Sequence, residues 1–352
     1  MNESNLSQEN FSNTKKESKP VSLNDGNTKD SMHTFRELSA QFEERFKTRH
    51  FPLQPEKLYD ASQYLLALGG KRIRPVMCLM GNEMFGEIKE DAYHVATAIE
   101  LFHNFTLIHD DIMDRAPIRR GMPTVHTKYG ESTALLAGDV MLVTGYESIQ
   151  KVHIDFLSKI LSLFNKTARE VCEGQQMDMD FEKIPDVSFD DYVEMITLKT
   201  SVALAASLQL GAILGGAGLG NQHHLYEFGK NLGIAFQVQD DYLDAFGNPE
   251  IFGKIPGGDI MANKKTFLLI QTMKIASEAQ QKELLRLLSL DDKSKIQPVL
   301  DLYRSCKVDE WAKELKQNYF SIAMRHLEEV AVLSARKKPL EELARYLMDR
   351  DM

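Results

Sequence analysis

The sequence contains few cysteines. Only three occur among 352 residues, and they are widely spaced (Cys78, Cys172 and Cys306), without a CxxC pair. This spacing provides no disulfide framework and suits a reducing compartment. We therefore expect a cytoplasmic protein whose cysteines are small buried hydrophobic side chains.

Prolines are also scarce. None lies between Pro123 and Pro185 or between Pro185 and Pro249. Because proline interrupts helices, these gaps permit long uninterrupted helical segments. No segment shows the clear alternation of polar and apolar residues that is typical of strands. The sequence therefore predicts an all-α fold, a large helical bundle.

Long hydrophobic runs and excess positive charge are missing as well. No segment approaches the ~20 consecutive apolar residues that span a bilayer, and the polar N-terminus has no hydrophobic signal core. The formal net charge of -9 argues against a nucleic-acid-binding protein. We expect no membrane span and no nucleic-acid partner.

The first 31 residues differ from the rest of the chain. Residues 1–31 are rich in Asn, Ser, Lys, Glu and Asp and have few large apolar side chains. Such a segment cannot bury enough surface to offset its conformational entropy. We expect residues 1–31 to be a disordered polar tail and residues 32–352 to form the folded domain.

An apolar segment at residues 100–114 ends in three aspartates, Asp110, Asp111 and Asp114. On a helix, Asp110 and Asp114 share a face, and His103 falls within about 40° of both. Like charges on one face repel unless a cation lies between them. Hard carboxylate oxygens favour Mg²⁺ over Zn²⁺ as that cation.

A second acidic cluster ends another apolar segment, at residues 236–244. Gln237, Asp240 and Asp244 lie within an arc of about 60° on helical geometry. A lone DDxxD can be a solvated helix end, but two copies on apolar helices predict two acidic walls that face each other across a cavity. The expected metal ligands are Asp110, Asp111, Asp114, Asp240, Asp241 and Asp244.

With these two clusters, the chain resembles the trans-isoprenyl diphosphate synthases (polyprenyl synthetases). The resemblance extends from about Phe35 to the C-terminus. The other matching motifs are Gly69–Pro75 (GGKRIRP), Arg119–Arg120, Gly174–Gln175 with Asp178, Lys199–Thr200, and Gly253–Lys254 with Asp259. The resemblance implies the isoprenoid synthase fold, a single-domain bundle with a central active-site cavity. It also implies two or three Mg²⁺ ions and a homodimer.

The resemblance also implies roles for individual residues. Isopentenyl diphosphate would bind to Gly70, Lys71, Arg74, His103 and Arg120. The allylic diphosphate would bind near Arg119, Lys199, Thr200, Gln237, Lys254 and Lys264. The catalytic set would be Asp110, Asp111, Asp114, Lys199, Asp240 and Asp241. Arg72 receives no role in this assignment.

Several of these residues have plainer interpretations when each is taken alone. The Gly69–Pro75 segment reads as a basic surface turn, and His103 as a structural histidine on an apolar helix. Gln175 and Asp178 share a helical face, so they line a site or form an interhelical hydrogen bond. Lys199 lies among apolar residues, and a buried lysine needs an anionic partner.

The implied reaction is the head-to-tail condensation of isopentenyl diphosphate with dimethylallyl, geranyl or farnesyl diphosphate. The allylic C1–O bond ionises, the double bond of isopentenyl diphosphate attacks the cation, and a proton is lost. No side chain is an obvious general base. In the family the released diphosphate takes the proton, which agrees with this.

Product length depends, by resemblance, on the residues five and four positions before the first aspartate motif. These are Phe105 and Thr106. The bulky Phe105 resembles short-chain enzymes, and the two residues between the acids of the first motif favour geranylgeranyl over farnesyl diphosphate as product. Helical geometry, however, places Phe105 about 140° from Asp110, with Thr106 nearer the acidic face.

Three other protein classes remain as alternatives. A class I terpene cyclase shares DDxxD and the all-α fold but would lack the Gly-Gly-Lys-Arg and paired-arginine motifs. A head-to-head synthase would not need an isopentenyl diphosphate site. A non-catalytic regulatory subunit would have degraded aspartates or cations, whereas every matched position in this chain is intact.

Overall fold

The computed structural model describes residues 32–247 and 257–349, and these are almost entirely helical. The predicted tail (1–31) and Lys254 lie outside the described residues. The α-helices are α1 (Phe35–Phe46), α2 (Glu56–Ala67), α3 (Ile73–Glu83), α4 (Glu90–Met113), α5 (Val125–Tyr129), α6 (Glu131–Ile149), α7 (Ile154–Phe181), α8 (Phe189–Ile196), α9 (Val202–Gly215), α10 (Leu219–Phe246), α12 (Gly258–Met261), α13 (Phe267–Ile275), α14 (Glu278–Leu288), α15 (Ile296–Ser305), α16 (Val308–Glu329) and α17 (Ser334–Met348). The all-α prediction is confirmed.

Three short elements complete the described chain. A π-helical turn, η1, spans Thr197–Ser201, and a 3₁₀ turn, η2, spans Lys293–Lys295. Two strands of two residues each, β1 (Ile118–Arg119) and β2 (Met122–Pro123), form an antiparallel hairpin after α4. This hairpin begins four residues after Asp114, the last aspartate of the first acidic cluster.

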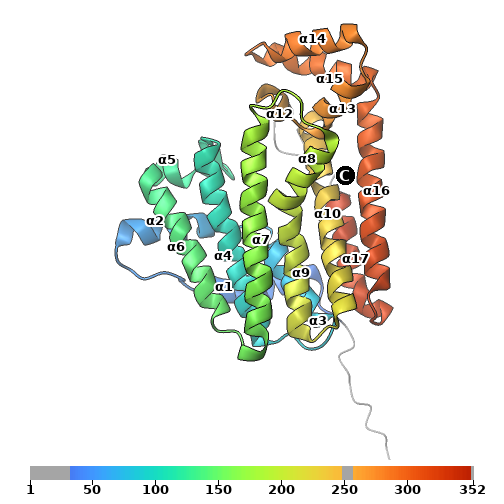
Figure 1. Cartoon of the computed structure of the whole chain (residues 1–352). Coiled ribbons are helices and arrows are strands. Elements are labelled where there is room, and N and C mark those ends of the chain that lie inside the picture. Colours follow the sequence, from blue (N-terminus) through green and yellow to red (C-terminus); the bar gives the residue numbers. More distant parts are fainter. Residues whose placement is uncertain (1–31, 248–256, 350–352) are drawn as a thin grey trace, which may run out of the picture. The chain divides into compact units, whose positions relative to one another are not determined.

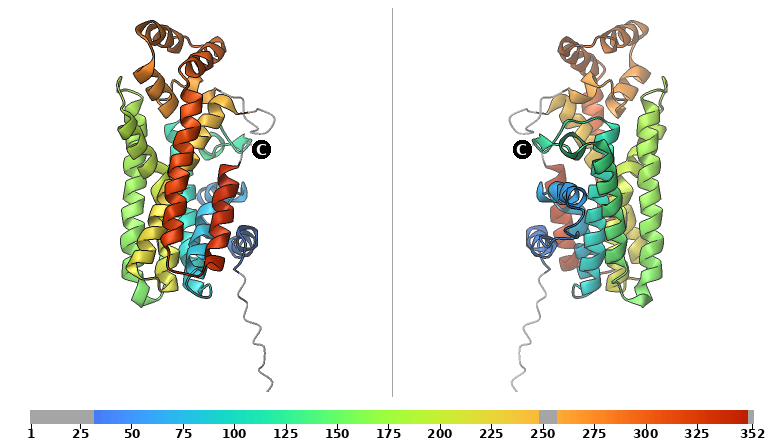
Figure 2. Two further views of the ribbon diagram at one scale, coloured as in Figure 1. Left: turned by 90° about the vertical axis from the view of Figure 1, so that its right-hand side faces the viewer. Right: turned by 90° about the vertical axis from the view of Figure 1, so that its left-hand side faces the viewer.

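The long helices lie side by side within residues 32–349 (Figure 1). The most extensive contacts join α10 to α16, α4 to α6, α3 to α9, and α9 to α10. Helices α13, α14 and α15 gather at one end of the bundle, while α17 contacts α1 and α16 (Figure 2). The acidic ends of α4 and α10 belong to two of these long helices, so the bundle holds both at fixed positions.

Small residues allow α3 and α9 to pack closely. Gly211 of α9 lies against the carbonyl of Cys78, and Gly81 of α3 lies against the carbonyl of Leu208. A methyl group at either glycine would overlap the facing backbone. The small residues of α9 therefore permit its close contact with α3.

The proline-free gap between Pro185 and Pro249 permits an uninterrupted helix, but η1 interrupts the helical segment between α8 and α9. Gly174 of α7 touches the backbone of Lys199, and Gly233 of α10 touches Ser201 from a second helix. With these close approaches, η1 lies in backbone contact with two neighbouring helices. Mid-helix π turns often occur at functional sites, and this one carries Lys199 and Thr200.

Two further expectations are modified by the structure. All three cysteines are free, but only Cys78 is buried; Cys306 is partly buried and Cys172 is exposed. The segment Phe189–Gly215 is long and apolar enough to cross a membrane, yet 67% of its most apolar window is buried inside the protein. Burial among other helices accounts for its apolar character without a membrane.

The α3–α9 contact predicts the effect of adding one methyl group. Gly211→Ala should lower the free energy of unfolding by about 1–3 kcal/mol, because the new methyl group overlaps the carbonyl of Cys78 and the helices must separate. Urea denaturation followed by circular dichroism measures this loss. Gly220→Ala is the control, because nothing lies within 4 Å of a Cβ there. Equal stability of the two variants would contradict the packing argument.

Candidate active site

The first acidic cluster ends α4, and its three aspartates have different surroundings. Asp110 lines a cavity between α4, α7 and α9. Burial raises the pKa of Asp110 to about 6; Asp114 and Asp111 add to this rise, whereas Lys199 and Arg119 oppose it. Asp114 is the C-cap of α4. Asp110 is therefore a carboxyl group whose charge is incompletely compensated.

Asp111 is buried and already paired with the hairpin. Arg119 donates from Nε and Nη2 to the two oxygens of Asp111, both at 2.8 Å. This bidentate pair ties β1 to the end of α4. Asp111 does not line the cavity that contains Asp110.

The second acidic cluster ends α10. Asp241 is buried, and its two oxygens accept hydrogen bonds from Tyr192 at 2.5 Å and from Nε2 of Gln237 at 2.9 Å. Burial raises the pKa of Asp241, whereas Lys264 and these hydrogen bonds lower it. Asp244 accepts a hydrogen bond from the backbone N–H of Asp259 at 2.9 Å. The helix end is thus tied to α8 and α12.

Asp240, the remaining acid of this cluster, is half-buried. Asp240 and Asp244 are four residues apart on α10, so they share one helical face, as the sequence predicts.

Two lysines connect the clusters electrostatically. Burial lowers the pKa of Lys264, but Asp241 and Asp259, together with Asp114 of α4, raise it well above the ordinary lysine value. Lys199 donates to Asp178 at 2.5 Å and also acts on Asp110. Lys264 therefore interacts electrostatically with acids at the ends of both α4 and α10. That the two clusters face each other across one cavity stays a prediction.

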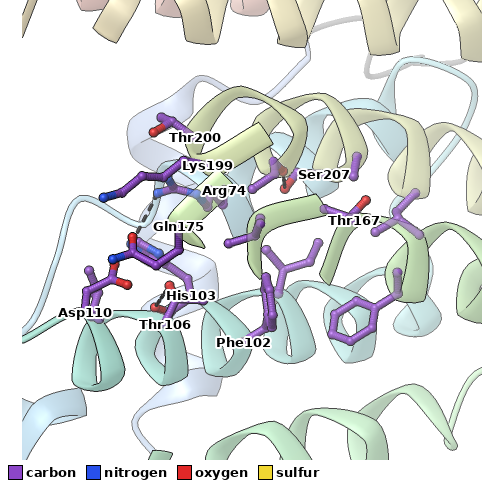
Figure 3. A pocket seen from close by; sticks show the side chains of 17 residues that line it. Arg74, Phe102, His103, Thr106, Asp110, Thr167, Gln175, Lys199, Thr200 and Ser207 are labelled. Carbon is purple, nitrogen blue, oxygen red and sulfur yellow. Dashed lines mark hydrogen bonds between the residues drawn. The ribbon is translucent and has the colours of Figure 1, made fainter. Parts of the chain in front are cut away.

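The cavity beside Asp110 changes in character along its length (Figure 3). Asp110, Gln175 and Lys199 lie at one end, while Phe102 and Thr167 lie toward the other. The same change from polar to apolar lining occurs along each of the three helical segments. Ile99, Phe164 and Leu210 each lie eleven residues from the polar residue of their own segment, Asp110, Gln175 and Lys199 respectively. Eleven residues correspond to roughly 16 Å of helix. An elongated apolar chain with a charged head group would fit this cavity.

The two predicted chain-length residues are placed differently. Thr106 lines the cavity. Phe105 does not; its ring packs against Phe102 and His109, with centroids 5.8 and 4.7 Å apart. The helical angle from Asp110 accounts for this difference, because Phe105 points away from the acidic face of α4. Phe102, whose ring meets that of Phe164 at 5.5 Å, lines the cavity in its place.

A second, cationic cavity adjoins the first. Its lining includes Gly70, Lys71, Arg74, His103 and Arg120, which the resemblance assigns to one substrate. Gly70 lies against the guanidinium of Arg120, 3.2 Å from the position of a Cβ. The two cavities share Arg74, His103 and Thr200. The structure therefore brings the assigned residues together around one junction.

Arg74 and His103 line both cavities and contact each other. Arg74 Nη1 lies 3.2 Å from His103 Nε2, which must accept because arginine only donates. Burial lowers the pKa of His103 far below its usual value, and the nearby arginines lower it further. The buried Nε of Arg74 has no hydrogen-bond partner. A neutral histidine beside a buried arginine with an unused donor favours an anionic ligand.

Arg72, which receives no role from the sequence, is buried in an ionic network. It donates from Nε to Glu43 of α1 at 2.5 Å and from Nη1 to Glu100 of α4. Asn104 also donates to Glu100, at 3.0 Å. Arg72 caps α3 with a left-handed φ of 51°. The network therefore fixes the turn that carries Lys71 and Arg74.

Sequence reasoning missed Tyr192 and the role of Arg72. Tyr192 belongs to no acidic or basic motif, although a tyrosine on an apolar helical face needs a partner for its hydroxyl group. That requirement was the available signal. The partners of Arg72, Glu43 and Glu100, lie on other helices, so no local pattern reveals them.

The carboxylates fit Mg²⁺ held together with a phosphate ligand. Within residues 32–247 and 257–349, no three His, Cys, Asp or Glu side chains converge enough to hold a metal by themselves. Mg²⁺ commonly takes one or two carboxylates and completes its shell with water and substrate phosphate. The raised pKa of Asp110 shows that added positive charge would stabilise its carboxylate. The donors fit this mode of binding.

Comparisons with known proteins agree with this site. The polyprenyl synthetase family model matches residues 55–306. A short chain isoprenyl diphosphate synthase of Methanothermobacter thermautotrophicus is 36% identical over 321 residues, 91% of this chain and 98% of that protein. A geranylgeranyl diphosphate synthase of Methanosarcina mazei is 46% identical over 219 residues, 62% of this chain and 68% of that protein.

A solved structure shows the same fold. A crystal structure of a geranylgeranyl pyrophosphate synthase superposes with a TM-score of 0.87 at 41% identity, covering 91% of this chain and all 100% of that one. The residues matched by the family model, 55–306, include both acidic helices and the cationic turn. This chain belongs to the polyprenyl synthetase family.

Proposed function

We propose that this prenyltransferase condenses isopentenyl diphosphate with an allylic diphosphate and that its main product is geranylgeranyl diphosphate. The single observation that carries the proposal is the pair of cavities that share Arg74, His103 and Thr200. One cavity is cationic, and the other runs from Asp110 and Lys199 into an apolar interior. The similarity to geranylgeranyl diphosphate synthases supports the product.

Isopentenyl diphosphate would occupy the cationic cavity. Lys71, Arg74 and Arg120 supply positive charge there, and the unused buried Nε of Arg74 offers a donor to a phosphate oxygen. Neutral His103 adds no charge but presents its ring at the junction. The small bound molecule would thus have its double bond directed toward the other cavity.

The allylic substrate would occupy the longer cavity, with its diphosphate at the acidic end and its chain between Thr106 and Phe102. Two or three Mg²⁺ ions would be held by the six aspartates of the two clusters and would supply positive charge to the leaving diphosphate. Lys199 and Lys264, with Arg119, add positive charge at the same end. The apolar lining excludes water from the reacting carbon.

Product analysis tests both the reaction and its length control. Purified protein with Mg²⁺, labelled isopentenyl diphosphate and farnesyl diphosphate should yield geranylgeraniol after dephosphorylation. Phe102→Ala should lengthen the product by at least one isoprene unit, because the ring of Phe102 lines the apolar cavity.

Phe105→Ala is the matched variant, with one aromatic ring removed outside the lining. We expect it to leave the product length unchanged. Longer products from Phe105→Ala alone would contradict the assignment to Phe102 and restore the assignment that rests on family resemblance. No elongation by folded wild-type protein would overturn the proposed reaction.

The ionic network around Arg72 predicts a selective effect on one substrate. Arg72→Lys should raise the KM for isopentenyl diphosphate about tenfold, the equivalent of ~1.4 kcal/mol, because lysine cannot bind Glu43 and Glu100 together and the turn carrying Lys71 and Arg74 loosens. The KM for the allylic substrate should change little. Steady-state kinetics with each substrate varied in turn measure both values.

The control is Arg45→Lys, which alters an arginine of α1 that pairs with Glu90 at 2.7 Å, outside both cavities. It should leave both KM values unchanged. An equal rise in the two KM values for Arg72→Lys would show a general loss of structure instead of a loosened diphosphate site.

We also propose a homodimer formed through α6. Leu136 and Val143 lie seven residues apart on one face of this helix and are 56% and 58% exposed. Exposed apolar side chains at helical spacing on one face suit a protein interface. Val143→Glu should shift the protein from dimer to monomer in light scattering, whereas Leu219→Glu, at an apolar residue 83% exposed elsewhere, should not. A monomeric wild type would contradict the proposal.

A further inference from the structure

Tyr192, which belongs to no sequence motif, lies at one end of a chain of hydrogen bonds. Its side chain is 1% exposed, and it projects from α8 toward the end of α10. The hydroxyl donates to Asp241 Oδ2 at 2.5 Å. Asp241 Oδ1 accepts from Gln237 Nε2 at 2.9 Å, and Gln237 Oε1 accepts from Thr200 Oγ1 at 3.4 Å.

The direction of this chain follows from chemistry. An ionised carboxylate only accepts hydrogen bonds, so Asp241 requires Gln237 to present its NH₂ group. The carbonyl oxygen of Gln237 must then face Thr200, which lines both cavities. The hydroxyl of Tyr192 and the Gln237 amide each satisfy one oxygen of a buried carboxylate, which would otherwise be costly to bury.

We propose that Tyr192 is a positioning residue for the metal–diphosphate end of the active site, acting through Asp241 and Gln237. Asp241 is held by α8 and by its own helix, so α10 keeps its second acidic face and the Gln237 carbonyl in one orientation. This inference rests on the proposed function, since it assigns a role within the same site. Tyr192 itself lines neither cavity, so its role would be exerted through its hydrogen-bond partners.

The position of α8 explains why a tyrosine there can act on α10. Tyr192 is seven residues before Lys199, and α8 leads directly into η1, which carries Lys199 and Thr200. The hydrogen bond to Asp241 therefore links the segment before the π turn to the second acidic helix. One hydroxyl group thereby joins the helix that leads to Lys199 to the helix that carries the second acidic cluster.

Tyr192→Phe tests the role because it removes the hydroxyl and keeps the ring. The first measurement is thermal stabilisation of the protein by Mg²⁺ with inorganic pyrophosphate, which requires no turnover. We expect the Mg²⁺ concentration for half-maximal stabilisation to rise about tenfold, the scale of one hydrogen bond to a charged group. We also expect kcat to fall about tenfold while the KM for isopentenyl diphosphate stays unchanged.

Tyr93→Phe is the matched control. Tyr93 is also buried, and its hydroxyl donates to Gln41 at 2.9 Å, outside both cavities. Its removal should lower stability slightly and leave Mg²⁺ dependence and kcat unchanged. If Tyr192→Phe behaves like Tyr93→Phe, the hydroxyl is merely structural and the inference is overturned.

A double-mutant cycle with Asp241→Asn tests the route of the effect. If Tyr192 acts through Asp241, the two changes should be strongly non-additive, with Tyr192→Phe having little further effect in the Asp241→Asn protein. Additive effects would overturn the proposed route. A wild-type protein that shows neither pyrophosphate-dependent stabilisation by Mg²⁺ nor condensation would instead contradict the proposed function, which separates the two failures.

Discussion

Repulsion between carboxylates is the constraint on which the rest of the structure depends. The ends of α4 and α10 bring two acidic clusters to one space, and like charges at such positions destabilise a protein without compensation. Several of these acids have a specific partner. Arg119 binds Asp111, Tyr192 and Gln237 donate to Asp241, and the backbone N–H of Asp259 donates to Asp244. Asp110, with its raised pKa, retains the uncompensated charge that a cation would neutralise.

Irregular segments of the fold supply cations near these acids. Arg119 comes from the only described hairpin, Lys199 from the only π turn in residues 32–247 and 257–349, and Lys264 from the link between α12 and α13. Regular helices provide length and rigidity, but a straight helix directs a side chain only at fixed angular steps. Departures from regular geometry therefore coincide with the charged groups of the site.

Much of this architecture was accessible from the sequence. The scarcity of proline predicts the long helices, and the small residues of α9 predict its close packing. The paired acidic motifs place the site at the ends of α4 and α10. These features are local: each depends on spacing within one segment.

The features that the sequence could not predict depend on contacts between segments. The π turn lies against glycines of two other helices, and the partners of Arg72 lie on α1 and α4. The orientation of Phe105 was visible in helical geometry, yet the resemblance pointed to the opposite assignment. In that case the periodicity of the sequence was the better guide to which side chain meets the cavity.

The junction at which the two cavities share Arg74, His103 and Thr200 has a thermodynamic consequence. A ligand that orders these side chains from one cavity changes the binding free energy in the other. By linkage, the factor by which the first ligand alters the affinity of the second must equal the factor in the reverse direction. Where such coupling operates, neither affinity has a single value that is independent of the occupancy of the other cavity.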